Sequence, residues 1–237
     1  MTINTKTLAA IDIGTNAIRL FISNVEEYPT ETLSKKIAFL RVPIRLGEDV
    51  FTTGEIGQQK RKRLCETMQG FSYIMSAFNV ESYKAYATCA MREARNGKSV
   101  AEQIQKECDL NIEIISGTKE AETIFAGGMN EVVDDDKTYL YVDVGGGSTE
   151  VIVYSKSVKI EACSFPLGTV RMLNDAVDKE EMKHFKKWLK NITEKYTPDA
   201  IIGSGGNINK IHKLLNKKER ERITYQELDI LYEYMRS

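Results

Sequence analysis

One short pattern occurs twice in this sequence, as AIDIGTN at residues 10–16 and as YVDVGGG at residues 141–147. In each copy an apolar run ends in Asp-x-Gly, a polar segment follows, and a second apolar run begins, at Leu20 and at Val151. This arrangement predicts two β-hairpins. Glycine permits a positive φ and close approach, so the backbone N–H groups of such a turn can surround an anion. Two matching hairpins favour two similar domains with a phosphate group held between them.

The candidate phosphate-binding residues are those of the two turns. They are Gly14, Thr15 and Asn16 in the first turn, and Gly145, Gly146, Gly147, Ser148 and Thr149 in the second. Asp12 and Asp143 end the strands before the turns and would face the same anion. A carboxylate is tolerated there if it holds a cation or a water molecule. The alternative is that each aspartate only closes its own turn.

The rest of the chain predicts an α/β fold. Apolar runs predict strands at residues 8–13, 18–25, 37–42, 82–87 and 112–115, and helical stripes cover residues 55–78 and 182–196. Strands that alternate with helices indicate α/β architecture. The acidic stretch VDDDK at residues 133–137 is the best boundary between halves. We therefore expect one domain at residues 1–132 and a second at residues 133–237.

Composition excludes several classes of protein. The 237 residues contain 33 Lys and Arg against 34 Asp and Glu, a net charge of −1, so a nucleic-acid partner is not expected. Two basic runs, 60–63 and 217–222, have acidic neighbours and predict solvated helix faces. The two histidines cannot form a His-rich metal site, so a metal would need oxygen ligands. Without a signal peptide or an apolar run of about 18 residues, the prediction is a cytoplasmic protein with no membrane partner.

Six segments together resemble one family in the order in which they occur. They are residues 10–20, 87–96, 114–122, 143–150, 165–171 and 201–206. The chain is similar to the exopolyphosphatase and guanosine pentaphosphate phosphatase family of the actin-like superfamily. The resemblance implies two actin-like (ribonuclease H-like) domains with a cleft between them. Family members normally continue past Ser237, so the second domain is expected to be cut short at its C-terminus.

The resemblance also implies roles for individual residues. Glu120 matches the family's catalytic base, and Arg92 matches an arginine that stabilises phosphate charge. Arg19 is a further phosphate-binding candidate, while Asp143, Glu150 and Asp12 are candidates to hold Mg²⁺. From the residues alone, Glu120 is better explained as an acid in the first turn of a helix predicted to start near Thr118, and Arg92 as a solvated side chain.

The function that this family implies is a Mg²⁺-dependent phosphohydrolase. Its substrate would be inorganic polyphosphate or a phosphorylated guanosine nucleotide, guanosine pentaphosphate, and family members often pair, which allows a homodimer. Two alternatives stay open: a catalytically weak sensor of polyphosphate or guanosine tetraphosphate, and an ATP-dependent small-molecule kinase. The motif GSGG at residues 203–206 resembles an adenosine-binding loop and does not separate these classes.

Overall fold

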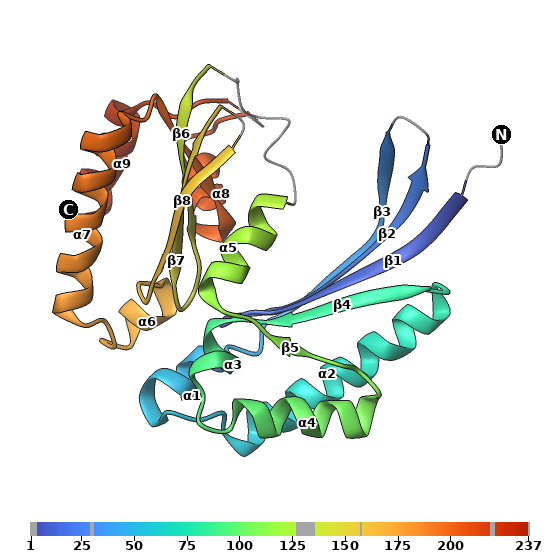
Figure 1. Ribbon diagram of the computed structural model, residues 1–237. Helices are drawn as coiled ribbons and strands as arrows, with labels where there is room; N and C mark the ends of the chain where they lie inside the picture. Colours follow the sequence, from blue (N-terminus) through green and yellow to red (C-terminus); the bar gives the residue numbers. More distant parts are fainter. Residues whose placement is uncertain (1–3, 29–30, 127–135, 157, 219–220, 237) are drawn as a thin grey trace.

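The strands form two sheets with the same order (Figure 1). The computed structural model describes residues 4–28, 31–126, 136–156, 158–218 and 221–236. The first sheet has the order β3-β2-β1-β4-β5 and the second has the order β8-β7-β6-β9. Their bounds are β1 (Asn4–Ile13), β2 (Ile18–Glu27), β3 (Thr32–Val42), β4 (Ser82–Ala87), β5 (Glu113–Ile114), β6 (Thr138–Val144), β7 (Thr149–Ser155), β8 (Val158–Phe165) and β9 (Ala200–Ser204).

The pairing repeats strand by strand. Strands β1–β2 and β6–β7 are antiparallel hairpins, β3 and β8 continue them antiparallel, and β4 and β9 join the first strand of each hairpin in parallel. The repeated pattern in the sequence therefore extends over four strands of each sheet. The expected α/β fold with two similar sheets is confirmed.

Strand β3 is longer than the sequence pattern predicts, since it begins at Thr32 and not at Ile37. It lies at the edge of its sheet, and most of its residues are exposed. An exposed edge strand does not need an apolar alternation, so only its last residues carry the pattern.

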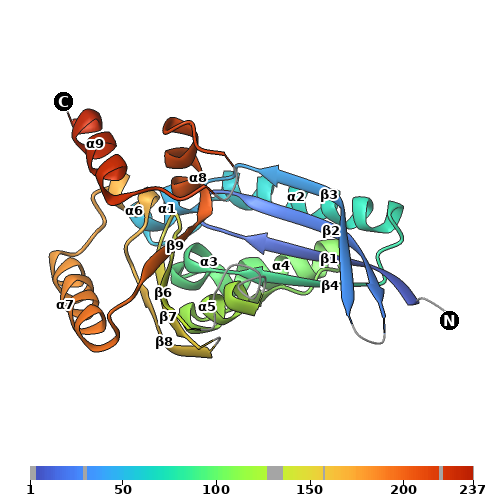
Figure 2. The ribbon, with the colours of Figure 1, turned by 90° about the horizontal axis from the view of Figure 1, so that it is seen from above.

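Nine helices are described, and most of them pack on the sheets or beside the hairpin turns. They are α1 (Leu46–Thr53), α2 (Gln58–Ala77), α3 (Cys89–Glu93), α4 (Gly97–Cys108), α5 (Gly117–Ala126), α6 (Thr169–Leu173), α7 (Lys179–Tyr196), α8 (Gly205–Leu214) and α9 (Tyr225–Arg236). Seen from above, α2 and α4 lie across one side of the first sheet (Figure 2). The predicted stripe of α2 is buried there at Leu64, Met68, Phe71 and Met75, whereas Phe78 follows the helix and is 41% exposed.

The second sheet is covered on both faces. On one face Ala121 of α5 packs with Tyr141 and Ile152, and on the other Ile192 of α7 belongs to the cluster around Phe165. Helix α5 comes before the predicted boundary at residues 132 and 133, yet it lies against the second sheet (Figure 1). The boundary itself falls outside the described residues, and the division into two domains stays a prediction.

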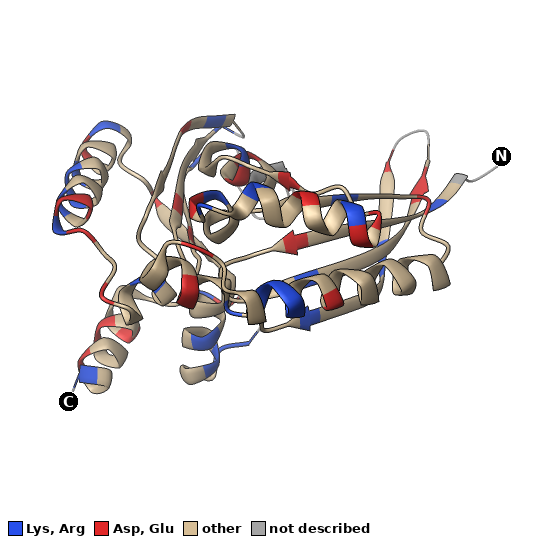
Figure 3. Cartoon of the chain, turned by 90° about the horizontal axis from the view of Figure 1, so that it is seen from below, with Lys and Arg blue, Asp and Glu red and all other residues tan. Residues whose placement is uncertain are grey.

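Charged side chains are mixed over the helices, with basic and acidic segments alternating along them (Figure 3). Two lysines of the basic runs are not solvated as predicted. Lys60 is 14% exposed and pairs with Glu48 and Asp49, and Lys217 is 13% exposed and pairs with Glu221 and Glu227. Each lysine therefore stabilises the local structure through its ion pairs.

Candidate phosphate-binding site

The two hairpin turns meet at one pocket with a volume of about 780 Å³. In the first turn the Gly14 N–H donates to the Ala17 carbonyl at 3.2 Å, and in the second the Gly145 N–H donates to the Ser148 carbonyl at 2.9 Å. The turns are so close that a Cβ atom added to Gly147 would lie 2.9 Å from the Thr15 Oγ1 atom.

Glycine is therefore needed in these turns because the two turns approach each other closely, and not because the backbone has a positive φ angle. Among the described glycines only Gly54 and Gly205 have a positive φ. Of the two properties of glycine named above, the turns use close approach, and a short helix supports each turn from outside.

Helix α1 supports the first turn. The carbonyl groups of Thr15 and Asn16 accept hydrogen bonds from the backbone N–H groups of Gly47 and Arg45, both at 2.9 Å. No described peptide bond is cis. In a trans peptide the N–H points opposite to the C=O, so the N–H groups of Asn16 and Ala17 point away from α1. Thr15, Asn16 and Ala17 all line the pocket.

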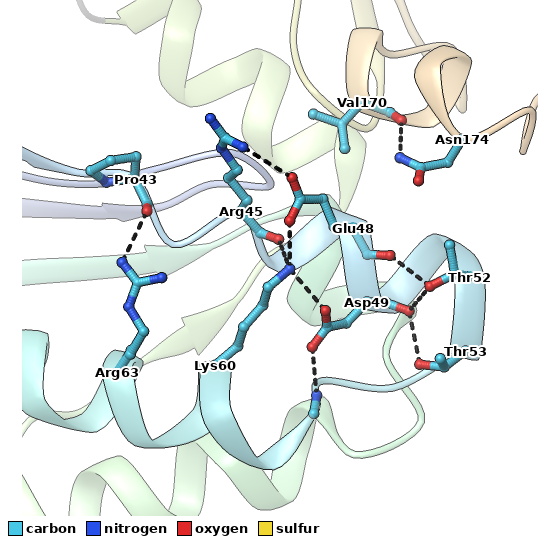
Figure 4. Close-up of polar contacts among 11 residues, drawn as sticks. Pro43, Arg45, Glu48, Asp49, Thr52, Thr53, Lys60, Arg63, Val170 and Asn174 are labelled. Atoms are coloured by element: carbon cyan, nitrogen blue, oxygen red, sulfur yellow. Dashed lines mark hydrogen bonds and ion pairs between the residues drawn. The ribbon is translucent and has the colours of Figure 1, made fainter.

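Helix α1 is itself fixed to α2 by Lys60 (Figure 4). The Lys60 Nζ atom donates to the Arg45 carbonyl at 2.6 Å and lies 3.0 Å from Glu48 and 2.8 Å from Asp49. Asp49 also accepts the Gly57 N–H at 3.0 Å. The first turn therefore rests on a helix that an ion-pair network holds in place.

Helix α6 supports the second turn in the same way. The Gly145 carbonyl accepts from the Thr169 N–H at 3.0 Å, and the Gly146 carbonyl accepts from the Val170 N–H at 2.8 Å. By the same planarity, the N–H groups of Gly146 and Gly147 point to the far side of the turn. Successive N–H groups that point one way form a concave site for an anion.

Each sheet also contributes one row of polar side chains. Strand register aligns Arg41, Arg19, Asp12 and Tyr86 across the first sheet. The equivalent row of the second sheet is Ser164, Glu150, Asp143 and Ser204. The first row contains two arginines, whereas the second contains two carboxylates and two hydroxyl groups. The two rows therefore differ in charge although they occupy the same place in the repeat.

The two carboxylates of the second row differ in exposure: Glu150 is buried and Asp143 is half-buried. Glu150 is 2% exposed and accepts a hydrogen bond from the Ser164 hydroxyl at 2.8 Å. Asp143 accepts from the Ser204 hydroxyl at 3.3 Å. Burial raises the pKa of both carboxyl groups, and the serine hydroxyls oppose this rise. Two partly compensated carboxylates are a suitable donor set for a hard divalent cation.

Asp12, in the first row, is paired differently from Asp143. It forms an ion pair with Arg19, directly opposite on the neighbouring strand. Burial raises the pKa of Asp12, and Arg19 opposes the rise. The guanidinium group already neutralises this aspartate, so it is a weaker metal ligand candidate than Asp143.

Glu120 projects from the first turn of α5 toward the same pocket. Its side chain is 17% exposed. Burial raises the pKa of Glu120 to about 7, with repulsion from Glu150 adding to the effect and Arg92 opposing it. Arg92 lies 3.4 Å from the Glu120 carboxylate and donates to the Ile115 carbonyl at 2.8 Å.

The structure brings most of the predicted site residues to the pocket wall. These are Asp12, Gly14, Thr15, Asn16, Arg19, Glu120, Asp143, Gly145, Gly146, Gly147, Ser148 and Glu150. Arg92 is not among the lining residues, but it contacts Glu120, which is. Thr149 is also set back, because its hydroxyl donates to the Leu167 carbonyl.

Several lining residues were not predicted from the sequence, among them Arg41, Tyr86 and Asn207. Arg41 lies opposite Arg19 in the register of β3 with β2. Asn207, near the start of α8, donates to the Val144 carbonyl at 2.9 Å. Arg41 could be placed at the pocket only from the pairing of β3 with β2, and the apolar pattern of the sequence alone does not give that pairing.

The described residues contain no cluster of three or more His, Cys, Asp or Glu side chains arranged to hold a metal ion. Mg²⁺ usually keeps several waters and binds through one or two carboxylates together with substrate phosphates. Asp143 and Glu150 fit that mode of binding. No described helix combines the length and the apolar character needed to cross a membrane.

Two sheets of the same strand order, each contributing an equivalent hairpin turn to one pocket, define a protein of the actin-like class. The chain belongs to the Ppx/GppA phosphatase family, whose pattern matches residues 13–235. The resemblance seen in the sequence, including the actin-like fold, is confirmed.

Relatives and solved structures agree with this assignment. The chain is 25% identical to a putative exopolyphosphatase of Haemophilus influenzae over 97% of this chain and 74% of that protein. It is 24% identical to a guanosine-5'-triphosphate,3'-diphosphate pyrophosphatase of Aeromonas hydrophila over 96% of this chain and 48% of that protein. The crystal structure of an exopolyphosphatase from Cytophaga hutchinsonii matches with a TM-score of 0.79 and 25% identity, covering 94% of this chain and 74% of that one. The chain thus spans about half to three quarters of the length of these relatives.

Proposed function

We propose that this chain hydrolyses the terminal phosphoanhydride bond of inorganic polyphosphate or of guanosine pentaphosphate. The observation that carries the proposal is the position of Glu120. It is a buried carboxyl with a pKa of about 7, and it lines the same pocket as the two turns. A general base works best when its pKa lies near the working pH.

The turns bind the terminal phosphate in this proposal. The N–H groups of Asn16 and Ala17 approach from one side and those of Gly146 and Gly147 from the other. Phosphoryl transfer needs mainly positioning and charge stabilisation. Arg41 lies opposite Arg19 in the strand register and lines the pocket, so it extends the basic character of the pocket beyond Arg19. We assign Arg41 to the next phosphate of the substrate.

Glu120 accepts a proton from the attacking water, and Arg92 keeps its carboxylate oriented. The Arg92 side chain is 26% exposed and lies beside Glu120, whose carboxylate lines the pocket. It stabilises charge through Glu120 in the resting protein and through phosphate oxygens in the transition state. The resulting reaction transfers a phosphoryl group to water without a covalent intermediate on the protein.

A divalent cation, Mg²⁺, would be held by Asp143 and Glu150, with Asp12 less suitable because it pairs with Arg19. When bound, the ion neutralises phosphate charge. Burial raises the pKa values of Asp143 and Glu150, and a bound cation would favour their ionised forms. Ser164 and Ser204 orient the two carboxylates.

The test is phosphate release in the presence of Mg²⁺, with long-chain polyphosphate and guanosine pentaphosphate compared on wild type, Glu120→Gln and Glu122→Gln. Glu122 is the control, since it lies on the same helix, is 44% exposed and pairs with Lys159. We expect Glu120→Gln to lose at least about a hundredfold in turnover and Glu122→Gln to be unchanged. Binding without release in the wild type would support the sensor, and transfer from ATP to a small acceptor would support the kinase.

A further inference from the structure

Arg171 joins the second hairpin turn to the first half of the molecule. It belongs to α6 and is 9% exposed. Its Nε atom donates to the Gly147 carbonyl at 2.9 Å, and its Nη2 atom contacts both carboxylate oxygens of Glu93 at 2.6 and 2.7 Å. The guanidinium group also lies 4.2 Å from the centre of the Phe51 ring. One side chain therefore connects α6, the second turn, α3 and α1.

The Gly147 carbonyl is the last of three consecutive turn carbonyls that accept hydrogen bonds from α6. The carbonyls of Gly145 and Gly146 accept from the backbone of α6, and the next carbonyl, that of Gly147, accepts from the Arg171 side chain. All three carbonyls are thus held on the α6 side of the turn. The N–H groups of Gly146, Gly147 and Ser148 must then point to the other side, because each peptide is trans. Arg171 fixes the last of these three donors.

The other end of the Arg171 contact is Glu93, the neighbour of Arg92 on α3. Cys89, also on α3, lies 3.5 Å from the Arg171 Nη2 atom. A Cβ atom added to Gly147 would lie 2.5 Å from the Cys89 sulfur, so the turn rests directly on this helix. Any shift of α3 relative to the turn would separate Arg92 from the N–H groups of the turn.

We propose that Arg171 is a positioning residue that clamps the second phosphate-binding turn to α3 through Glu93. The clamp keeps the N–H groups of residues 146–148 and the Arg92 guanidinium at a fixed separation. This inference rests on the proposed function, since it assumes that both groups act on one phosphate. Arginine uses two different nitrogen atoms here, Nε for the Gly147 carbonyl and Nη2 for the Glu93 carboxylate, whereas lysine has only one nitrogen to offer.

The variants are Arg171→Lys, Glu93→Gln and the double variant. Arg95→Lys is the matched control, because Arg95 also pairs with a glutamate, Glu55 at 3.7 Å, but is 69% exposed and outside the pocket. We expect Arg171→Lys to lower kcat at least about thirtyfold and to change KM less than about threefold, since misplacement mainly affects the transition state. The double variant should lose no more than the worse single variant. Circular dichroism and Tm confirm that each variant is folded.

Hydrogen exchange gives a readout that does not depend on turnover. The amides of residues 169–171 are bonded to the turn, and we expect them to exchange faster in Arg171→Lys than in wild type or Arg95→Lys. A folded Arg171→Lys variant with wild-type kcat, or with unchanged exchange, overturns the clamp. A wild-type protein that releases no phosphate contradicts the proposed function instead. In that case hydrogen exchange alone tests the clamp, and exchange at residues 169–171 that is equal in wild type and Arg171→Lys overturns it.

Discussion

Arg19 and Glu150 occupy equivalent positions in the two hairpins. Each lies directly opposite the aspartate that precedes its turn, Arg19 opposite Asp12 and Glu150 opposite Asp143. In the first hairpin the pair is an ion pair, whereas the second hairpin places two carboxylates side by side. The two hairpins therefore share the same backbone arrangement but carry different charges next to the turn. One half is suited to phosphate oxygens and the other to a cation.

The rate should depend on the ionisation of Glu120. Its pKa is raised to about 7 by burial and by Glu150, so below this pH the base is protonated. We expect kcat/KM to rise as the pH increases through about 7 and then to level off. The measurement is a pH profile of phosphate release at fixed Mg²⁺. A profile that is flat between pH 5 and 8 would remove Glu120 as the base.

The same pKa shift predicts a change in stability with pH. The folded protein binds the Glu120 proton more tightly than the unfolded chain does, since the ordinary pKa of a glutamate side chain is 4.5. This contribution to the free energy of unfolding is fully present below about pH 4.5 and is lost as the pH rises through about 7. Glu120→Gln should therefore reduce the fall in stability between these pH values, by up to roughly 3 kcal/mol. Urea unfolding at pH 5 and pH 8 tests this, with Glu122→Gln as the control, and an unchanged slope contradicts it.

Arg41 should contribute to substrate affinity. It is exposed at the pocket wall and lies opposite Arg19. We expect Arg41→Gln to raise KM about three- to tenfold with little change in kcat, because an exposed charge is partly screened by solvent. Lys36→Gln on the same strand is the control, since Lys36 is exposed and does not line the pocket. If Arg41→Gln and Lys36→Gln raise KM equally, the loss of one positive charge explains the effect, and Arg41 is not a binding residue.

The hairpins were predictable because their signal is local. Asp-x-Gly between two apolar runs encodes strand, turn and strand within one segment, and the turns at Gly14 and Gly145 form as expected. The helix that carries Glu120 was also predictable, since it begins at Gly117, close to the expected start. What these features share is that each depends on neighbours in the sequence.

Arg41 and Arg171 were not assigned roles because their environments are set by distant residues. Arg41 reaches the pocket through the pairing of β3 with β2, which contains an irregularity between Ile22 and Ser23. Arg171 of α6 meets Glu93 of α3 although the two residues are 78 positions apart in the sequence. No periodicity along the chain encodes such a contact. The two-sheet fold is thus easier to predict than the details of the site.

Ser164 should support cation binding through Glu150. Its hydroxyl donates to the Glu150 carboxylate at 2.8 Å and opposes the rise in the pKa of that group. Ser164→Ala leaves the carboxylate less ionised, so we expect the Mg²⁺ concentration for half-maximal rate to rise about tenfold. Ser155→Ala on β7 is the control, since the Ser155 hydroxyl bonds to Thr138. An unchanged Mg²⁺ dependence in folded Ser164→Ala would show that Glu150 does not hold the ion.

Gly168 should be required for the position of the second turn. A Cβ atom there would lie 2.4 Å from the backbone of Gly146 and Gly147, which cannot rotate away as a side chain can. We expect Gly168→Ala to lower the free energy of unfolding by about 1–3 kcal/mol and to reduce kcat, because the turn must move. Gly70 is the matched control: it lies within α2 with nothing within 4 Å of an added Cβ atom, and Gly70→Ala should stabilise the protein by up to about 1 kcal/mol. Urea unfolding and phosphate release are measured on both variants, and a Gly168→Ala protein as stable and active as wild type would show that the turn tolerates displacement.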